Sequence, residues 1–394
     1  MTQPDFDRII DRRGTHCSKW DDMQAAYGVG ADDGLAMWVA DMDFAPPAAV
    51  QAAVDRAAAH GVYGYPGANP PYLAAIGWWM AHRHGWQIRP EWVLTCAGLV
   101  NAVGMALNAY TRPGDGVVVM APVYHAFGRV IRAAGRDLVE LPLAMTDGQY
   151  ALDWDAWEGM LTGRERMMIL CSPHNPGGRV WSEAELRQVA DFCDRHDLIL
   201  ISDDIHADLV LPGGPRHRMM ATVAPDILPR LVTLTAATKT FNIAGAHIGN
   251  AIIPDPDLRA RFQGALAAAG ISPAMLGQDM VAAAYSPEGA AWVDALVDYL
   301  DGNRRIFDQA VNAIPGLRSM PLQATYLSWV DFRDTGMTDA EITRRIQDDA
   351  RIAANHGATF GLGGDGFMRF NIATPRARVI EAADRLRAAF ADLQ

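Results

Sequence analysis

Lysine is almost absent from this chain. Lysine and arginine together number 34 among 394 residues, and only Lys19 and Lys239 are lysines, so 34 − 2 leaves 32 arginines. Arginine can replace lysine in most surface ion pairs, but its guanidinium stays protonated. A lysine amine can lose its proton and attack a carbonyl. Composition alone leaves open whether Lys239 is a leftover surface cation or a reactive amine.

Cysteine, long apolar runs and excess positive charge are also scarce. The four cysteines lack metal-ligand or paired spacing, which favours free thiols in a reducing cytoplasm; they are Cys17, Cys96, Cys171 and Cys193. No apolar run approaches the roughly 18 residues of a membrane span. The charged N-terminal stretch MTQPDFDRIIDRRG lacks a signal-peptide core. The lack of a long apolar run predicts no membrane as a partner. The net charge of −12 repels polyphosphate, so we expect no nucleic acid as a partner.

The central part of the chain alternates between short apolar runs and helix-length segments. The predicted strands are WVLT (92–95), GVVVMAP (116–122), RMMILCSP (166–173), LILISDD (198–204), LVTLTA (231–236) and IGNAIIP (248–254). The segment 182–196 opens with Ser182 and Glu185, a capping box that predicts a helix. Strands buried on both faces and joined by helices predict a mainly parallel α/β sheet. Such sheets bind ligands at the carboxyl ends of their strands.

The two ends of the chain differ from its centre. The C-terminal part holds an amphipathic segment, TDAEITRRIQDDARI (338–352), predicted as a helix, and strand-like pieces at 326–332 and 367–373. We therefore expect a large ligand-binding domain over residues 46–286 and a smaller α+β domain over residues 287–394. An N-terminal segment, 1–45, should pack beside the smaller domain.

Polar clusters follow three of the predicted strands. Asn175 lies in SPHNPGGRV, Asp203 opens the polar part of SDDIHADL, and Lys239 lies in AATKTFNIAG. Taken singly, Asn175 is explained by a turn and Asp203 by a helix cap or a surface acid. A buried carboxylate without a partner would be costly, so Asp203 needs a partner if it is buried. Their joint occurrence at strand ends favours a functional site.

This set of side chains suits the chemistry of pyridoxal 5′-phosphate (PLP). A lysine forms a Schiff base with the aldehyde of PLP, and an aspartate keeps the pyridine nitrogen protonated so that the ring withdraws electrons. An asparagine can donate a hydrogen bond to the phenolic oxygen. The sequence therefore predicts a PLP site and no metal.

The order of the motifs resembles that of fold-type I PLP enzymes of the class I/II aminotransferase superfamily. The matching strings are TCAGLVNAV, APVYHAF, SPHNPGGRVW, SDDIHADL, TKTFNIAG and GFMRFNIATPR. With WVADMDFAPP (38–47) and HGVYGYP (60–66), the chain is most similar to the MalY/PatB-type C–S lyase branch, the cystathionine β-lyases. The resemblance runs from about Trp20 to the C-terminus. It implies a mainly parallel sheet of the seven-stranded type with a smaller α+β domain.

The resemblance implies roles around the PLP ring. Lys239 matches the Schiff-base lysine, and Asp203 matches the partner of the pyridine nitrogen. Asn175 and His206 match residues near the phenolic oxygen, and Asn175 is also expected to contact the substrate. Tyr124 matches the aromatic residue that stacks on the ring, although taken alone it also suits a core position.

Further matches concern the phosphate and the substrate. Gly98 and Leu99 match backbone donors to the phosphate at a helix N-terminus. Tyr65 matches a tyrosine of the active site that reaches the phosphate of the neighbouring subunit, which implies a homodimer with shared sites. Arg369 matches the arginine that clamps the substrate carboxylate, although taken alone it suits a surface strand. Ala40 is expected to contact the substrate.

Four positions depart from the superfamily pattern. His247 stands where aminotransferases commonly have an arginine against the phosphate, which favours the lyase branch. Thr238, expected to contact the cofactor, replaces the usual serine before the lysine. Asp204 and Gly177 replace a glutamate and a valine, and neither change removes a named role.

The implied activity is cleavage of L-cystathionine or related cysteine S-conjugates to a thiol, pyruvate and ammonia, as in methionine biosynthesis. One alternative is an aminotransferase, which shares every residue needed for loss of the Cα proton. Another is a regulatory protein that keeps the fold and sequesters a transcription factor. His206 and the string WVADMDF favour the lyase. Retention of the matching catalytic residues argues against a role in binding only.

Overall fold

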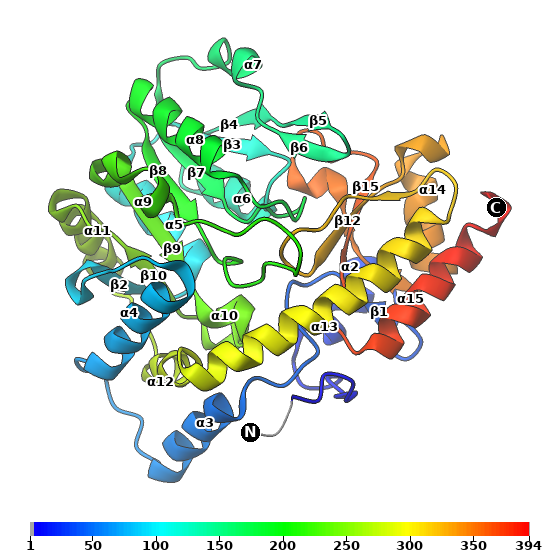
Figure 1. Cartoon of the computed structure of the whole chain (residues 1–394), viewed down its shortest axis with the longest axis horizontal. Coiled ribbons are helices and arrows are strands. Elements are labelled where there is room, and N and C mark those ends of the chain that lie inside the picture. Colours follow the sequence, from blue (N-terminus) through cyan, green and yellow to red (C-terminus); the bar gives the residue numbers. More distant parts are fainter. Residues whose placement is uncertain (1–3, 394) are drawn as a thin grey trace.

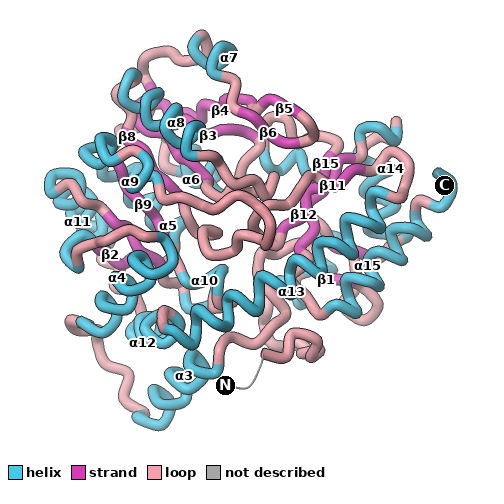
Figure 2. The backbone as a smooth tube through the Cα atoms, viewed as in Figure 1, coloured by secondary structure: helices cyan, strands magenta, loops and turns pink. Residues whose placement is uncertain are grey.

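Two sheets organise the molecule. The computed structural model describes residues 4–393, and the long helix α13 (Pro287–Asn312) runs past both sheets (Figure 1). A seven-stranded sheet forms the centre of the larger part, and a four-stranded sheet forms the centre of the smaller part. Loops gather between the two sheets (Figure 2).

The larger sheet is mainly parallel, as predicted. Its order is β2 (Val93–Cys96), β10 (Gly249–Ile252), β9 (Leu231–Thr235), β8 (Ile199–Asp203), β7 (Glu165–Cys171), β3 (Gly116–Ala121) and β4 (Asp137–Pro142). Strand β10 is antiparallel to both of its neighbours, and Gly249 pairs with Cys96. The first residue of β10 therefore lies at the same sheet edge as the carboxyl ends of the other strands.

Helices cover both faces of this sheet. All residues of β3 are buried, and they alternate between two cores: Val117 and Val119 pack into one, Val118 and Met120 into the other. The first core is covered by α5 (Leu99–Tyr110), α6 (His125–Ala133) and α11 (Pro256–Ala269), the second by α4 (Pro70–His84), α8 (Glu183–Arg195), α12 (Met275–Ala284) and α13. Burial on both faces explains why the strands are continuous apolar runs.

Local sequence signals account for most of these elements. The six predicted strands are all present, with ends that differ by a residue or two. The capping box of α8 is formed, because the Ser182 side chain accepts from the backbone of Glu185 and the Glu185 carboxylate accepts from the backbone of Ser182. Strand β4 was not among the predicted strands, since its sequence DLVELP carries the charges of a partly exposed edge strand.

The smaller sheet is antiparallel and is packed beside α13 and α15 (Arg376–Ala389). Its order is β11 (Arg318–Ser319), β12 (Leu327–Asp331), β15 (Phe367–Asn371) and β14 (Asn355–His356). Several connecting elements of the larger part are short: β5 (Ala144–Thr146), β6 (Gln149–Ala151), α7 (Trp154–Glu158), α9 (Met220–Val223) and α10 (Ala237–Thr240).

The helix predicted over 338–352 is wrong at its C-terminal end. Helix α14 (Asp339–Arg344) continues as a π-helical turn, Arg345–Asp349, and Arg351 then adopts a left-handed conformation with φ of 54°. Ile352 belongs to β13 (Ile352–Ala353), which pairs with β1 (Leu35–Ala36). Tertiary pairing therefore overrides the helical periodicity at this point.

The N-terminal segment packs against the smaller part through the β1–β13 pair. It includes α1 (Ser18–Asp21) and α2 (Met23–Tyr27), and after β1 an extended stretch leads to α3 (Ala48–His60). The boundaries at residues 45 and 286 remain predictions. Among residues 4–393, no helix is both long enough and apolar enough to cross a membrane.

Candidate active site

One cavity is lined by all of the residues predicted for the site except Tyr65 and Arg369. It has a volume of about 260 Å³ and lies at the edge of the larger sheet where the parallel strands end. Its lining includes the predicted residues Ala40, Gly98, Leu99, Tyr124, Asn175, Asp203, His206, Thr238 and Lys239. They converge because they lie at or just after the carboxyl ends of five strands, β2, β3, β7, β8 and β9, apart from Ala40, which comes from the N-terminal segment. The structure fixes their positions, and their individual roles remain predictions.

Lys239 lies near the end of α10, directly after β9. Its Nζ donates a hydrogen bond to the backbone oxygen of Ala40 at 2.5 Å, and the Tyr326 hydroxyl donates to the same oxygen at 3.0 Å. Burial lowers the pKa of Lys239 from 10.5 to about 8, although the charge of Asp41 opposes this shift. An amine with this pKa is partly neutral near neutral pH, as a nucleophile or base requires.

Asp203 is the last residue of β8 and is buried. One of its oxygens accepts a hydrogen bond from the backbone N–H of Ile205 at 3.2 Å. Burial raises the pKa of Asp203 to about 7, and the neighbouring carboxylate of Asp204 adds to this shift. A buried carboxylate of this kind is stabilised by a cationic partner, and a protonated pyridine nitrogen would be one.

Arg369 is not at the surface, which settles the alternative left open by the sequence. It lies on β15 and is buried, and its Nη1 donates to Asn175 Oδ1 at 3.0 Å. Its Nη2 donates to the backbone oxygen of Trp38 at 2.9 Å and to Asn355 Oδ1 at 2.5 Å. Within residues 4–393, its buried Nε has no hydrogen-bond partner. Arg369 does not line the cavity itself, but Asn175 joins it to the cavity wall.

A helix N-terminus also lines the cavity. Residues 97–101 line it, with Gly98 at φ of 89° before the first turn of α5. The first backbone N–H groups of a helix have no partner within the helix, so they favour an anion such as a phosphate. His247 lines the cavity beside this helix, where the superfamily commonly has arginine.

The other predicted residues differ in their surroundings. His206 is buried, its Nδ1 has no partner within residues 4–393, and burial lowers its pKa to about 3, so its ring is neutral. Tyr124 precedes α6 and packs edge-on against Phe127. Tyr65 is 100% exposed in the loop between α3 and α4 and does not line the cavity. Any role of Tyr65 in catalysis therefore requires a second chain.

Sequence reasoning missed several residues that support the site. Asp208 accepts hydrogen bonds from Trp79 Nε1 and Thr240 Oγ1, both at 3.0 Å, and so ties α10 to α4. Tyr326 donates to the Ala40 oxygen that also accepts from Lys239, and Asn355 accepts directly from Arg369. Asp208 lies in the motif SDDIHADL, which gave a signal, whereas Asn355 lies in a stretch without a motif.

The residues present fit PLP. An amine, a buried carboxylate and a helix N-terminus surround one cavity, and they match the aldehyde, pyridine nitrogen and phosphate of the cofactor. The unpaired His206 Nδ1 provides a further polar group. Among the described residues, 4–393, no cluster of three or more His, Cys, Asp or Glu side chains could hold a metal ion.

Comparison with known proteins agrees with the site. The family model for aminotransferase class I and II matches residues 37–386. The cystathionine beta-lyase PatB of Bacillus subtilis (strain 168) is 37% identical over 98% of this chain and 99% of its own length. The protein MalY of Escherichia coli (strain K12) is 33% identical over 95% and 96% of the two chains.

A solved structure shows the same fold. The crystal structure of cystalysin from Treponema denticola, which contains PLP, is 34% identical and covers 100% of both chains with a TM-score of 0.94. These matches confirm the resemblance drawn from the motifs. The chain therefore belongs to the aminotransferase class I and II family, in the branch that includes PatB and MalY.

Proposed function

We propose that this chain is a PLP-dependent C–S β-lyase that converts L-cystathionine, or a related cysteine S-conjugate, and water into a thiol, pyruvate and ammonia. The observation that carries the proposal is the convergence of Lys239, Asp203 and Asn175 on one cavity in a chain so similar to PatB. The thiol released from L-cystathionine is homocysteine. Its methylation gives methionine, so we place the reaction in methionine biosynthesis.

PLP is the cofactor of this family, and the residues that would hold it are those of the cavity. The chemistry that it supplies when bound is an electron sink for the bond broken at the substrate Cα. Lys239 would hold the aldehyde carbon, and Asp203 would hold the pyridine nitrogen. Asn175 and His206 would contact the phenolic oxygen, and Tyr124 the ring face. Gly98, Leu99 and Thr238, together with Tyr65 of a second chain, would hold the phosphate.

Two side chains would act directly on the substrate. The buried guanidinium of Arg369 binds the α-carboxylate, with Asn175 and Trp38 fixing its orientation. The amine of Lys239, displaced by the substrate amine, takes the Cα proton, because its lowered pKa leaves it partly neutral. The resulting Lys239 ammonium can then donate a proton to the departing sulfur. One residue thus serves as base and acid for the two proton transfers.

The experiment that tests the proposal is turnover of L-cystathionine by the PLP-loaded enzyme without any added keto acid. A lyase regenerates the aldehyde form of its cofactor in every cycle, so thiol, pyruvate and ammonia should accumulate over many turnovers. The measurement is thiol release by a chromogenic disulfide, with pyruvate followed by lactate dehydrogenase. Lys239→Ala should abolish product formation.

An aminotransferase would behave differently, because its amino group stays on the cofactor after the first half-reaction. Turnover would stop after one equivalent and resume when 2-oxoglutarate is supplied. That result would replace the lyase proposal with the aminotransferase alternative. Absence of any reaction with cysteine S-conjugates, together with normal PLP binding, would instead favour the regulatory alternative.

We also propose that the active unit is a homodimer in a reducing cytoplasm. Exposed apolar side chains occur on the loop after α3, at Val62 and Tyr63, and near α12, at Ile271 and Leu276. A cavity lined by Val62, Tyr63 and Met275 joins the two stretches. A second chain seated on this surface would cover it and would place Tyr65 within reach of the partner's cavity.

The cysteines bear on the compartment. All four cysteines are free, which suits a reducing compartment such as the cytoplasm.

A further inference from the structure

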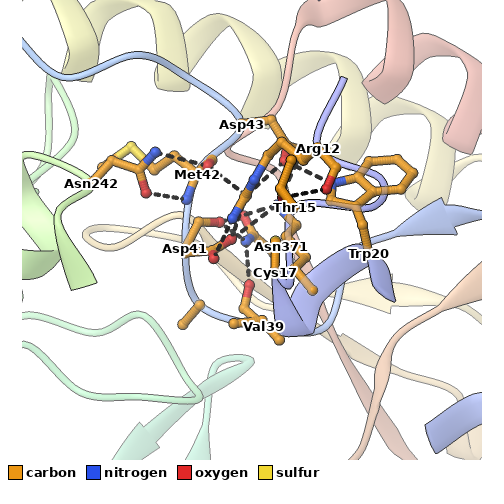
Figure 3. Close-up of polar contacts among 12 residues, drawn as sticks. Arg12, Thr15, Cys17, Trp20, Val39, Asp41, Met42, Asp43, Asn242 and Asn371 are labelled. Atoms are coloured by element: carbon orange, nitrogen blue, oxygen red, sulfur yellow. Dashed lines mark hydrogen bonds and ion pairs between the residues drawn. The ribbon is translucent and has the colours of Figure 1, made fainter. Parts of the chain in front are cut away.

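A buried charge cluster holds the segment 38–43, here called the strap, and includes the second lysine of the chain. Lys19 is 0% exposed, and its Nζ lies 3.1 Å from Asp43 Oδ2 and donates to the backbone oxygen of Asp41 at 3.1 Å. Asp43 is also buried and accepts from Trp20 Nε1 and Arg12 Nη1, both at 3.0 Å. Figure 3 shows Arg12 and Trp20 converging on the two aspartates of the strap.

Such a cluster needs an explanation other than stability. Removing several charges from water is expensive, and an apolar cluster of the same volume is often as stable. The ion pairs instead fix the position of Asp43, which three cations reach from separate parts of the chain. These are Arg12 of the N-terminal segment, Lys19 of α1 and, at 3.4 Å, Arg378 of α15. Because Asp43 is the last residue of the strap, these ion pairs hold the strap in place.

Two backbone oxygens of the strap, two residues apart, contact the two side chains that would act on the substrate. The Trp38 oxygen accepts from Arg369 Nη2 at 2.9 Å, and the Ala40 oxygen accepts from Lys239 Nζ at 2.5 Å. A carbonyl oxygen orients the donor that it accepts from, so the position of the strap sets the positions of the guanidinium and the amine.

The strap is also fastened between the larger and smaller parts. The side-chain amide of Asn242, three residues after Lys239, accepts from the Met42 N–H and donates to the Met42 oxygen, both at 2.8 Å. On the other side, Asn371 of β15 donates to the oxygens of Val39 and Asp41. Figure 3 shows the two asparagines on opposite sides of the strap. A shift of the strap would therefore reach both Lys239 and Arg369.

We propose that Lys19 is a positioning residue for catalysis: through its ion pair with Asp43 it fixes the strap, which in turn holds Lys239 and Arg369 in their reactive orientation. Lys19 touches neither the substrate nor the cofactor. A lysine suits this position because one compact ammonium reaches both Asp43 Oδ2 and the Asp41 oxygen from a site without access to water. The inference rests on the proposed function only for its kinetic readout.

The test compares Lys19→Met with Arg13→Met in the PLP-loaded full chain. Arg13 belongs to the same segment, but its ion pair with Asp11 is exposed and does not touch the strap. We expect Lys19→Met to lower kcat/KM for L-cystathionine by about 100-fold, the cost of a misplacement of about 1 Å. KM should rise because Arg369 loses its support, and kcat should fall because Lys239 does. Arg13→Met should match the wild type.

A readout independent of activity is amide hydrogen exchange in the same holoenzymes. The N–H groups of Met37, Met42 and Asp43 donate to Ala353, Asn242 and Ala373, respectively. Their exchange should become at least about tenfold faster in Lys19→Met, while strands of the larger sheet keep their protection. This arm remains informative if L-cystathionine is not the substrate, so failure of the proposed function and failure of this inference are distinguishable.

A purely structural role makes a different prediction. Loss of stability alone reduces the number of folded molecules, which lowers the apparent kcat and leaves KM unchanged. A KM within about twofold of wild type, or unchanged exchange in the strap, would therefore overturn the inference. If Lys19→Met does not fold, Trp20→Phe replaces it, because it removes one hydrogen bond to Asp43 and keeps the charges. Trp20→Phe must then raise KM and speed exchange in the strap, and failure to do so would also overturn the inference.

Discussion

The two lysines of the chain have different environments, and arginine suits neither of them. Lys239 has its amine in the cavity, where desolvation lowers its pKa and makes it reactive. Lys19 has its ammonium in a site of 0% exposure, where it stays paired with Asp43. Arginine would keep its charge in the first position and would need more space in the second. Because lysine is so scarce, the labelling of Lys239 can be followed with Lys19 as the only other lysine side chain.

That property allows the pKa of Lys239 to be measured without any turnover. Only a neutral amine reacts with trinitrobenzenesulfonate, so the labelling rate of the Lys239 peptide in the cofactor-free chain should have its midpoint at about pH 8 instead of 10.5. Asp203→Asn should lower this midpoint further, because the charge of Asp203 favours the ammonium. Mass spectrometry of the peptide gives the rate, and buried Lys19 should remain unlabelled. A midpoint near pH 10 would show that burial does not activate the amine.

At the scale of elements, the apolar runs and polar strand ends predicted most of the sheet and the cavity. The strands are buried on both faces, so their sequences carry a strong signal, and the residues after them carry the chemistry. The groups that hydrogen-bond to Lys239 and Arg369 could not be predicted in the same way. Asn355 and the backbone oxygens of Trp38 and Ala40 act through contacts between segments far apart in sequence. The predicted end of the helix at residue 352 was wrong because it also depends on a contact between distant segments. Ile352 pairs with Leu35 in the β1–β13 pair, so the helix ends before it.

The close approach of β10 to the start of α5 leads to a prediction for cofactor affinity. A Cβ added at Gly249 would lie 2.5 Å from Leu99 Cδ2, directly beside the backbone of Gly98. Gly249→Ala should therefore displace the helix N-terminus and weaken PLP binding by roughly tenfold, the size of a 1–2 kcal/mol loss from overpacking. Fluorescence titration of the cofactor-free chain with PLP gives the Kd.

The matched control for this prediction lies in the same helix. A Cβ added at Gly104 of α5 would lie 3.9 Å from Val130 Cγ1, an ordinary van der Waals contact, so Gly104→Ala should fit. It should leave the Kd for PLP unchanged and should stabilise the helix by about 0.5–1 kcal/mol. Equal Kd values for the two variants would mean that the packing of Gly249 on Leu99 does not set the phosphate site.

At the scale of the whole molecule, the single chain leaves one predicted residue of the site unused. Tyr65 is 100% exposed, and its loop lies beside apolar side chains that are also exposed, Val62 at 64% and Tyr63 at 73%. Monomeric proteins rarely expose such a group of side chains without a function for it. A two-fold symmetric dimer would bury the loop of each chain against its partner and complete both cavities.

Complementation between two inactive variants tests this arrangement directly. Lys239→Ala removes the reactive amine of its own chain, and Tyr65→Asp places an anion where the partner's phosphate would bind, so each homodimer should be inactive. In a mixed dimer, one cavity combines both defects and the other has native Lys239 and native Tyr65. Refolding equal amounts together should restore about a quarter of wild-type activity, because half of the dimers are mixed and each holds one native site. Light scattering should give a dimer mass for every sample. Dimers that form but show no activity after mixing would contradict the shared cavity, and an active Tyr65→Asp homodimer would mean that Tyr65 serves no phosphate site.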